Sequence, residues 1–370
     1  MRSGSMLRWS LSILFFFVCF VSTGWQQAQA QTTSRIIEFD APGAAQGTIP
    51  EQNTLSGVIA GFFVDVNGVA HGFVRSPRGE FTTLDAPGAG TAPDSGQGTF
   101  AFGITDAGTV VGFYNDTNGV GHGYVRAPDG KFTTFDAPGA GTSPGEGTFP
   151  AAINPTGAIS GDYVDAGGIS HGFVRSPDGT IISFDPSGSV FTIANTLGID
   201  PGGAISVPYF DANNVNHGAV RAPDGTITNY DAPGAGTNSG QGTGPQAISP
   251  NGTVAGLFVD ADNVFHAFLR LPNGTVITFD APGAGTGAGQ GTQALATNLP
   301  GITVGQLIDA NGANHGFLRT PGGKLFFFDP PDAGTGPGQG TIPLSINLTG
   351  VVTGLYIDGN DGAHGFVRFP

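Results

Sequence analysis

The chain has 370 residues and a formal net charge of −15, and its composition includes 64 Gly, 27 Pro and a single Cys. Aromatic residues make up 10% of it, nearly all of them Phe, so the chain has enough apolar side chain to form a core and is not expected to be disordered. The length would suit two or three ordinary domains, although closed all-β folds run longer as single units.

The N-terminus has the pattern of a secretory signal peptide. Residues 1–8 carry two arginines and no acid, residues 11–21 are apolar, and Ala28-Gln29-Ala30 is a small-residue cleavage pattern. The apolar run is too short to span a bilayer comfortably. We therefore expect residues 1–30 to be removed and the mature protein to be secreted or periplasmic, with no membrane anchor.

The composition of the mature chain excludes several kinds of chemistry. Cleavage would remove the only Cys, both Met and both Trp, and would leave 11 basic and 28 acidic residues, a net charge of −17. Without cysteine there are no disulfides, no thiolate nucleophile and no Cys-ligated metal. An acidic surface that is poor in Lys repels phosphate backbones and anionic lipid, so neither nucleic acid nor a membrane is an expected partner.

All seven histidines belong to one repeated pattern, in which successive histidines lie 46 to 51 residues apart. Each has an Asp six residues before it and an Arg four residues after it. The seven sets are Asp65/His71/Arg75, Asp116/His122/Arg126, Asp165/His171/Arg175, Asp211/His217/Arg221, Asp260/His266/Arg270, Asp309/His315/Arg319 and Asp358/His364/Arg368. A further fixed Asp lies 14 residues after each of the first six histidines, and an additional copy has no histidine before it. These residues are Asp85, Asp136, Asp185, Asp231, Asp280, Asp329 and the additional copy, Asp40. A period of this length indicates a repeat architecture.

Each repeat contains four short strand-like runs separated by Gly, Asn, Asp and Pro, with no helical periodicity. In the second repeat the predicted strands are residues 101–104, 109–115, 121–127 and 131–135. The segments between them are rich in Asp-Gly and Asn-Gly, which favour tight turns. Each repeat is therefore predicted to be a four-stranded antiparallel meander.

Seven such meanders are typical of a β-propeller, whose blades pack face to face around an axis. The C-terminus ends after a third strand, and residues 35–39 form an orphan fourth strand that would complete the last blade. We predict an all-β fold, a seven-bladed β-propeller over residues 31–370 that is closed by this N-terminal strand. An open solenoid or two separate sheets are alternatives, but neither explains the complementary ends. The predicted blades are 46–85, 97–136, 146–185, 190–231, 241–280, 290–329, and 339–370 with 35–40.

A glycine lies ten residues before six of the histidines, where repeat four has Val207 followed by Pro208. Glycine inside a strand often marks a close approach of another backbone, so neighbouring sheets are predicted to approach closely there. The six glycines are Gly61, Gly112, Gly161, Gly256, Gly305 and Gly354.

The whole mature chain resembles the HAF-type extracellular repeat, a family of exported bacterial proteins named for a His-Ala-Phe tripeptide. That tripeptide occurs once, at His266-Ala267-Phe268, and the other copies read His-Gly-Phe, His-Gly-Tyr or His-Gly-Ala. The resemblance implies an exported repeat protein. It implies no particular activity, because the family is defined by its repeat.

The Asp, His and Arg sets could be read as catalytic, because His and Asp are a common acid–base pair. They occur in every repeat, however, and a ring cannot bring seven copies to one reaction centre. We therefore predict that each set forms a buried hydrogen-bonded network that pins the second and third strands. No catalytic or cofactor-binding residue and no metal ligand is predicted.

Calcium is the one cofactor that the sequence raises as an alternative. The turns at residues 260–263 and 358–361 resemble the start of a calcium loop, but they lack the distal Glu that completes an EF-hand. They are interpreted as hairpin turns. The histidines lie a whole repeat apart, so a transition-metal site built from several imidazoles is not indicated.

The loops after each fixed Asp and the turns between second and third strands are predicted to lie on one functional face. Repeat four departs most from the pattern, because it lacks the Gly-Gln-Gly-Thr motif. Aromatic and amide side chains suit carbohydrate, so its odd residues form a candidate ligand face, unless they belong to a drifted copy that repacks locally. These residues are Tyr209, Phe210, Asn213, Asn214 and Tyr230.

Two functions from different classes remain. The first is a secreted, non-catalytic binding or structural module, expected to be a monomer, for an extracellular polysaccharide or another exported protein. The second is a propeller enzyme, a polysaccharide lyase or glycosidase with its site at the central opening. The first is favoured, because all histidines are in register and no out-of-register catalytic set is evident.

Overall fold

The computed structural model describes residues 35–193 and 198–370, so the signal-peptide prediction lies outside the described residues. Within those ranges the chain is all-β, with 28 strands and no helix. None of the described residues forms a helix that could cross a membrane.

The strands form four-stranded antiparallel units in which the same four positions recur. The first strands are β2 (Gly47–Asn53), β6 (Gly98–Ile104), β10 (Gly147–Ile153), β14 (Phe191–Thr192), β18 (Gly242–Ile248), β22 (Gly291–Thr297) and β26 (Gly340–Ile346). The second strands are β3 (Ile59–Val64), β7 (Val110–Asn115), β11 (Ile159–Val164), β15 (Ile205–Phe210), β19 (Val254–Val259), β23 (Thr303–Ile308) and β27 (Val352–Ile357). The third strands are β4 (Ala70–Arg75), β8 (Gly121–Arg126), β12 (Ser170–Arg175), β16 (Asn216–Arg221), β20 (Phe265–Arg270), β24 (Asn314–Arg319) and β28 (Ala363–Arg368). The fourth strands are β5 (Phe81–Leu84), β9 (Phe132–Phe135), β13 (Ile181–Phe184), β17 (Ile227–Tyr230), β21 (Val276–Phe279), β25 (Leu325–Phe328) and β1 (Ile36–Phe39).

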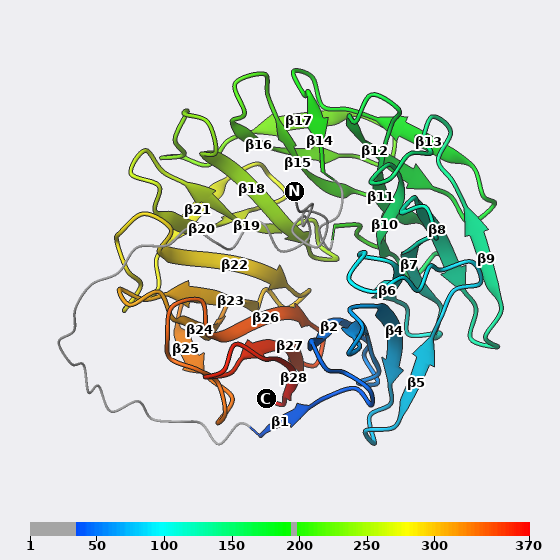
Figure 1. Cartoon of the computed structure of the whole chain (residues 1–370). Coiled ribbons are helices and arrows are strands. Elements are labelled where there is room, and N and C mark those ends of the chain that lie inside the picture. The colour runs from blue at the N-terminus through cyan, green and yellow to red at the C-terminus, as the bar shows by residue number, and fades with distance from the viewer. Residues whose placement is uncertain (1–34, 194–197) are drawn as a thin grey trace, which may run out of the picture.

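The strand predictions for the second repeat are confirmed to within three residues at every end, at β6 to β9. The N-terminal strand β1 pairs antiparallel with the C-terminal strand β28, from Ile36 opposite Arg368 to Phe39 opposite Gly365. Figure 1 shows these two ends of the chain, in blue and red, side by side.

The units lie around a common centre, with their first strands innermost and their fourth strands outermost (Figure 1). This radial arrangement of four-stranded sheets is that of a β-propeller. Third strands touch the next first strands through one parallel pair, as between Ala70 and Gly98. The hydrogen-bonded sheets do not form a closed ring, because β12 does not pair with β14 and β28 does not pair with β2.

Side-chain hydrogen bonds join the units at the two places where this strand pairing is missing. Ser170 Oγ donates to the Thr192 carbonyl at 2.7 Å between β12 and β14. Asn347 Nδ2 donates to the Thr54 carbonyl at 2.8 Å between the last and first units.

The apolar core is divided into clusters that lie between neighbouring units. One cluster packs Val111 of the second unit against Ile159 and Phe173 of the third. Another packs Val367 of β28 against Phe73 of β4. The buried Phe of each His-Gly-Phe or His-Ala-Phe segment contributes about 1.5–3 kcal/mol relative to an exposed side chain. Five such rings are completely inaccessible: Phe73, Phe173, Phe268, Phe317 and Phe366.

The second glycine of Gly-Gln-Gly-Thr is required by a close approach between units. At Gly291 φ is +125°, and a Cβ atom would lie 2.0 Å from the Phe265 carbonyl oxygen of the preceding unit. Only glycine combines this backbone conformation with so little space. In the five units whose first strand pairs with the preceding third strand, that first strand therefore begins where two backbones touch.

The glycines ten residues before the histidines have a different role from the one predicted. A Cβ atom on Gly305 would lie 2.0 Å from the Gln293 carbonyl oxygen, which belongs to β22 of the same unit. This contact lies beside a β-bulge between Ala294 and Ala296, where the extra residue displaces the first strand. The close approach is therefore within a sheet and not between sheets.

We expect Gly291→Ala to destabilise the fold more than Gly283→Ala. Both glycines have positive φ, but nothing lies within 4 Å of a Cβ atom placed on Gly283. The conformational cost of about 1–2 kcal/mol applies to both variants, and steric overlap should add about 1–3 kcal/mol for Gly291→Ala alone. Chemical unfolding of both variants measures the difference. Equal losses would show that the contact between units does not limit this position.

Candidate functional site

Each repeat histidine lies between two aspartates, one from each neighbouring connection. Its Nδ1 is 2.7–3.0 Å from the fixed Asp at the end of the fourth strand. Its Nε2 is 3.2–3.8 Å from the Asp of the turn between second and third strands. In the last unit the fixed Asp is Asp40, which lies 324 residues from His364 in the chain. The structure thus joins the Asp and the His of each set and adds the fixed Asp as a second partner.

The turn aspartates also hold their own hairpins. Asp358 Oδ1 accepts hydrogen bonds from the backbone amides of Asn360 and Gly362, each at 2.8 Å. These backbone hydrogen bonds, led by that of Gly362, hold the pKa of Asp358 below its usual value. Asp260 accepts from two amides in the same way, so both turns that resemble calcium loops use a carboxylate oxygen within the turn. In residues 35–193 and 198–370 no three His, Cys, Asp or Glu side chains are grouped as metal ligands.

The histidines and aspartates of the sets lie at the surface and not in the interior, contrary to the predicted buried network. The histidine side chains are 23–32% exposed and the fixed aspartates 38–59% exposed. In six units an aromatic ring of the second strand stacks on the imidazole, with centroids 4.8–5.2 Å apart. In these six units the fixed Asp therefore presents an oriented, accessible carboxylate beside an aromatic pair, whereas Leu307 lies opposite His315 in the remaining unit.

The arginines of the predicted sets do not join the histidines. Arg75 pairs with Ile59 at one end of β4, whereas His71 pairs with Phe63 near the other end. Strand extension separates residues four apart by about 13 Å, so the guanidinium contacts a fourth-strand ring of the preceding unit instead. The distances from guanidinium carbon to ring centroid are 4.4 Å for Arg75 and Phe39, 4.8 Å for Arg175 and Phe135, 5.1 Å for Arg221 and Phe184, 4.8 Å for Arg270 and Tyr230, 4.6 Å for Arg319 and Phe279, and 4.9 Å for Arg368 and Phe328.

The five candidate residues of repeat four are not brought together on one exposed face. Tyr209 is only 5% exposed and stacks on His217, as its counterparts do in other units. Tyr230 lies under Arg270, and its buried hydroxyl has no hydrogen-bond partner among the described residues. Strand alternation directs both rings into positions that the repeat already uses.

The remaining three residues of that candidate face are Phe210, Asn213 and Asn214. Phe210 is half-buried and pairs with the short first strand of its unit. Asn213 and Asn214 lie on the exposed turn, where Asn213 contacts Asp211 and Asn214 donates to Ser239 at 2.9 Å. Two asparagines on a turn, with both side chains already hydrogen-bonded, do not form a carbohydrate site by themselves.

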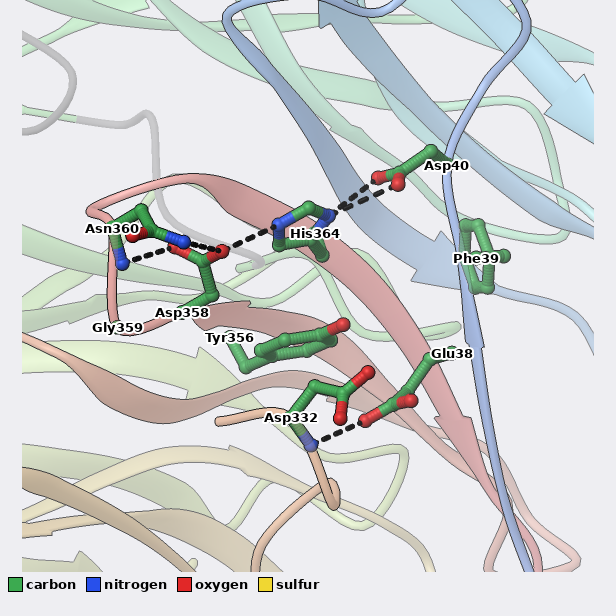
Figure 2. A pocket seen from close by; sticks show the side chains of 9 residues that line it. All are labelled: Glu38, Phe39, Asp40, Asp332, Tyr356, Asp358, Gly359, Asn360 and His364. Carbon is green, nitrogen blue, oxygen red and sulfur yellow. Dashed lines mark hydrogen bonds and ion pairs between the residues drawn. The ribbon is translucent and has the colours of Figure 1, made fainter. Parts of the chain in front are cut away.

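A pocket of about 490 Å³ in the last unit was missed by the sequence reasoning. Figure 2 shows its side chains, which come from β1, β27, β28, the turn between β27 and β28, and the loop after β25. The lining residues are Glu38, Phe39, Asp40, Asp332, Tyr356, Asp358, Gly359, Asn360 and His364.

Two acids distinguish this pocket from the equivalent positions of other units. Glu38 Oε1 accepts a hydrogen bond from the Asp332 amide at 3.0 Å, which holds the loop against β1. No other repeat has an acid at either position. The counterparts of Glu38 are Thr83, Thr134, Ser183, Asn229, Thr278 and Phe327, and those of Asp332 are Gly43, Gly88, Gly139, Gly188, Gly234 and Gly283. A column-by-column comparison of the repeats would have revealed both departures.

The pocket is strongly electronegative. Burial, and then the charges of Glu38 and Asp332 followed by those of the two repeat aspartates, raise the pKa of Tyr356 above its ordinary value. For Tyr114, the same position in the second unit, burial and only the two repeat aspartates raise the pKa. No Lys or Arg is among the residues that line the pocket.

A second cavity of about 310 Å³ lies at the inner ends of the first strands. Hydrogen bonds connect the units around it, as from Asn298 Nδ2 to the Asn347 carbonyl at 3.0 Å. Its lining comes from residues 52–55, 104–106, 152–155, 199–201, 247–248, 250, 296–299 and 345–348. Every unit therefore contributes to this central cavity.

We expect Arg319→Met to destabilise the fold more than Arg126→Met. Arg319 lies over the ring of Phe279, whereas the equivalent fourth-strand residue before Arg126 is Leu84, which has no ring. A cation–π contact is worth about 0.5–2 kcal/mol. Both variants lose the same packing of the arginine side chain, so this loss cancels in the comparison. Chemical unfolding, with Phe279→Leu to complete a double-mutant cycle, isolates the contact. Additive losses would mean that the ring and the guanidinium do not interact.

We expect the stabilising contribution of His315 to disappear at alkaline pH. The carboxylates of Asp309 and Asp329 raise the pKa of His315 to about 10, from 6.5 in the unfolded chain. Because folding favours the protonated form, this contribution is complete below about pH 6.5 and is lost as the pH rises through about 10. The difference in unfolding free energy between the parent and His315→Gln should therefore shrink from pH 6 to pH 10.5. A difference that does not vary with pH would contradict the ionic role.

Comparison with known proteins gives likenesses of fold. No family model and no curated protein matches the chain. The BP39L lectin from Burkholderia pseudomallei is similar with a TM-score of 0.51 and 14% identity, over 88% of this chain and 99% of the lectin. A puromycin hydrolase is similar with a TM-score of 0.54 and 12% identity, over 86% of this chain and 52% of the hydrolase, so this chain spans about half of that enzyme. At such identities the likeness concerns the fold alone.

Proposed function

We propose that this protein is an exported, non-catalytic, seven-bladed β-propeller that binds a glycan through its acidic face. The acidic face is the surface formed by the fixed aspartates, the turn aspartates and the seven histidines between them. The observation that carries the proposal is the recurrence of an oriented, accessible carboxylate on one face of every unit.

Contacts between the last and first units support a closed ring of seven blades. Strand β1 supplies the fourth strand beside β28. Val367 packs with Phe73 across this junction, and Asn347 donates to the Thr54 carbonyl. The central cavity, with lining from every unit, is also what a closed ring would enclose.

Export is supported by the sequence. A basic segment, an apolar run and a small-residue cleavage pattern precede residue 31, and the rest of the chain has no cysteine to oxidise. The resemblance to the HAF-type extracellular repeat points in the same direction. We therefore place the mature protein outside the cytoplasmic membrane.

The chemistry of the acidic face suits a hydroxyl-rich ligand. A carboxylate fixed by a histidine can accept hydrogen bonds from sugar hydroxyls without first losing conformational entropy. Several equivalent carboxylates on one face can bind successive units of a polymer, which raises avidity without new contacts. The likeness to a bacterial lectin agrees with this function at the level of fold analogy.

One observation favours the alternative of a polysaccharide-degrading enzyme. Glu51 lies on the innermost strand β2 without a hydrogen-bond partner among the described residues, and burial raises its pKa to about 8. A carboxyl group that stays protonated at neutral pH is what a general acid requires. In such an enzyme, Glu51→Gln would abolish activity without affecting binding.

The test is native electrophoresis of residues 31–370 through gels that contain single polysaccharides, followed by staining for the polymer. We expect at least one polysaccharide to retard the protein without clearing. The variant Asp136→Ala/Asp280→Ala should be retarded less, because it removes two carboxylates of the acidic face. The matched control is Asp178→Asn/Asp224→Asn. These residues lie on turns between third and fourth strands, at the opposite ends of the strands from the acidic face.

Two outcomes would contradict the proposal. Unchanged mobility in every polymer would exclude glycan binding. Clearing of a polymer that is abolished by Glu51→Gln would assign the enzymatic alternative instead.

A further inference from the structure

We infer that the pocket of the last unit binds an amino sugar through its ammonium group. This inference rests on the proposed glycan-binding function and names the class of sugar that one site would select. It follows from the charge of the pocket, the unpartnered hydroxyl of Tyr356, the volume of the pocket and a comparison with the second unit.

The charge of the pocket is uncompensated. Four carboxylates line it, and the imidazole of His364 is the only group there that can carry a positive charge. Even a protonated imidazole would leave three negative charges in excess. The four carboxylates repel one another, so a cationic ligand is stabilised in this pocket more than beside any repeat set with two carboxylates.

The hydroxyl of Tyr356 points to a ligand independently of the acids. The residue is 4% exposed, and its hydroxyl lines the pocket without a hydrogen-bond partner among residues 35–193 and 198–370. Figure 2 shows the ring between the two groups of acids, with its oxygen between His364 and Glu38. Buried phenols are normally hydrogen-bonded, and a sugar hydroxyl or an ammonium group would satisfy this one.

The arrangement suits an organic cation better than a metal ion. No three potential metal ligands are grouped anywhere in the described chain. Asp358 Oδ1 is occupied by two backbone amides, and Asp40 is held by His364. An ammonium group has three donors and can bond to separated carboxylates such as Glu38 and Asp332. The volume of about 490 Å³ lies within the range of small-ligand sites and can hold a sugar ring.

The second unit offers an internal comparison. It has the same tyrosine stacked on the same histidine, Tyr114 on His122, between two repeat aspartates. Its residues at the two departing positions are Thr134 and Gly88. The sugar-selecting residues are therefore Glu38 and Asp332, which the last unit adds to a scaffold that other units share.

The experiment is isothermal titration calorimetry of residues 31–370 with two oligosaccharides, at pH 6 and 0.15 M salt. One is a β-1,4-linked glucosamine tetramer, and the other is its fully N-acetylated counterpart, which lacks the charge. We expect the free-amine tetramer to bind the parent protein at least tenfold more tightly. Glu38→Gln/Asp332→Asn should remove this preference, and Tyr356→Phe should reduce affinity for the free-amine tetramer.

Matched variants separate this pocket from general attraction to an acidic protein. Asp178→Asn/Asp224→Asn changes the net charge by the same amount on the opposite face, and Tyr114→Phe removes the equivalent phenol. Both should leave the affinity unchanged. Glutamine at position 38 retains the acceptor for the Asp332 amide, so the loop should keep its place, and melting temperatures will check this.

Three outcomes would overturn the inference. Equal affinity for the two tetramers, or an equal loss in the control variant Asp178→Asn/Asp224→Asn, would do so. So would binding of a lysine tetrapeptide but not of the free-amine tetramer, which would assign the pocket to a protein partner. Retardation by neutral polysaccharides together with any of these results would leave the proposed glycan binding intact, whereas no binding to any glycan would remove both.

Discussion

The contact between the third strand of one unit and the first strand of the next is the constraint on which the rest of the structure depends. A carbonyl oxygen occupies the place where a side chain would begin, as Phe265 does at Gly291. The preceding loop is thereby fixed, and Gln290 ties it down by accepting from the Gly287 amide and donating to the Ala310 carbonyl. The loop before the first strand and the turn between the second and third strands are then held together on the face that carries the histidines.

The repeated residues build this face, and departures from the repeat pattern create a distinct binding site on it. The repeated Asp–His–Asp sets position strands and turns in the same way in every unit. Glu38 adds charge at a fourth-strand position where the other units have Thr, Ser, Asn or Phe, and Asp332 replaces a glycine that all six other repeats have in the loop before the first strand. A repeat protein can therefore acquire a distinct site by a few substitutions while its neighbours continue to support the fold.

Local patterns predicted much of the fold, and they failed where a side chain reaches another unit. The strands of the second repeat and the pairing of β1 with β28 follow from alternation and turn residues. The fixed spacing of each Arg from its His suggested contact, but four residues along an extended strand separate them, and Arg319 instead meets Phe279 of another blade. Tyr209 looked unusual in sequence but occupies an ordinary buried repeat position.

The sequence by itself determined the repeat, its four strands, and the pairing of each histidine with an aspartate six residues away. These features depend on short-range geometry, which residue type and spacing specify. Only the tertiary structure decided that Glu38 and Asp332 meet, because 294 residues separate them in the chain. Their meeting requires the first strand of the described chain to lie beside its last, and a pocket forms only when such distant segments are packed together.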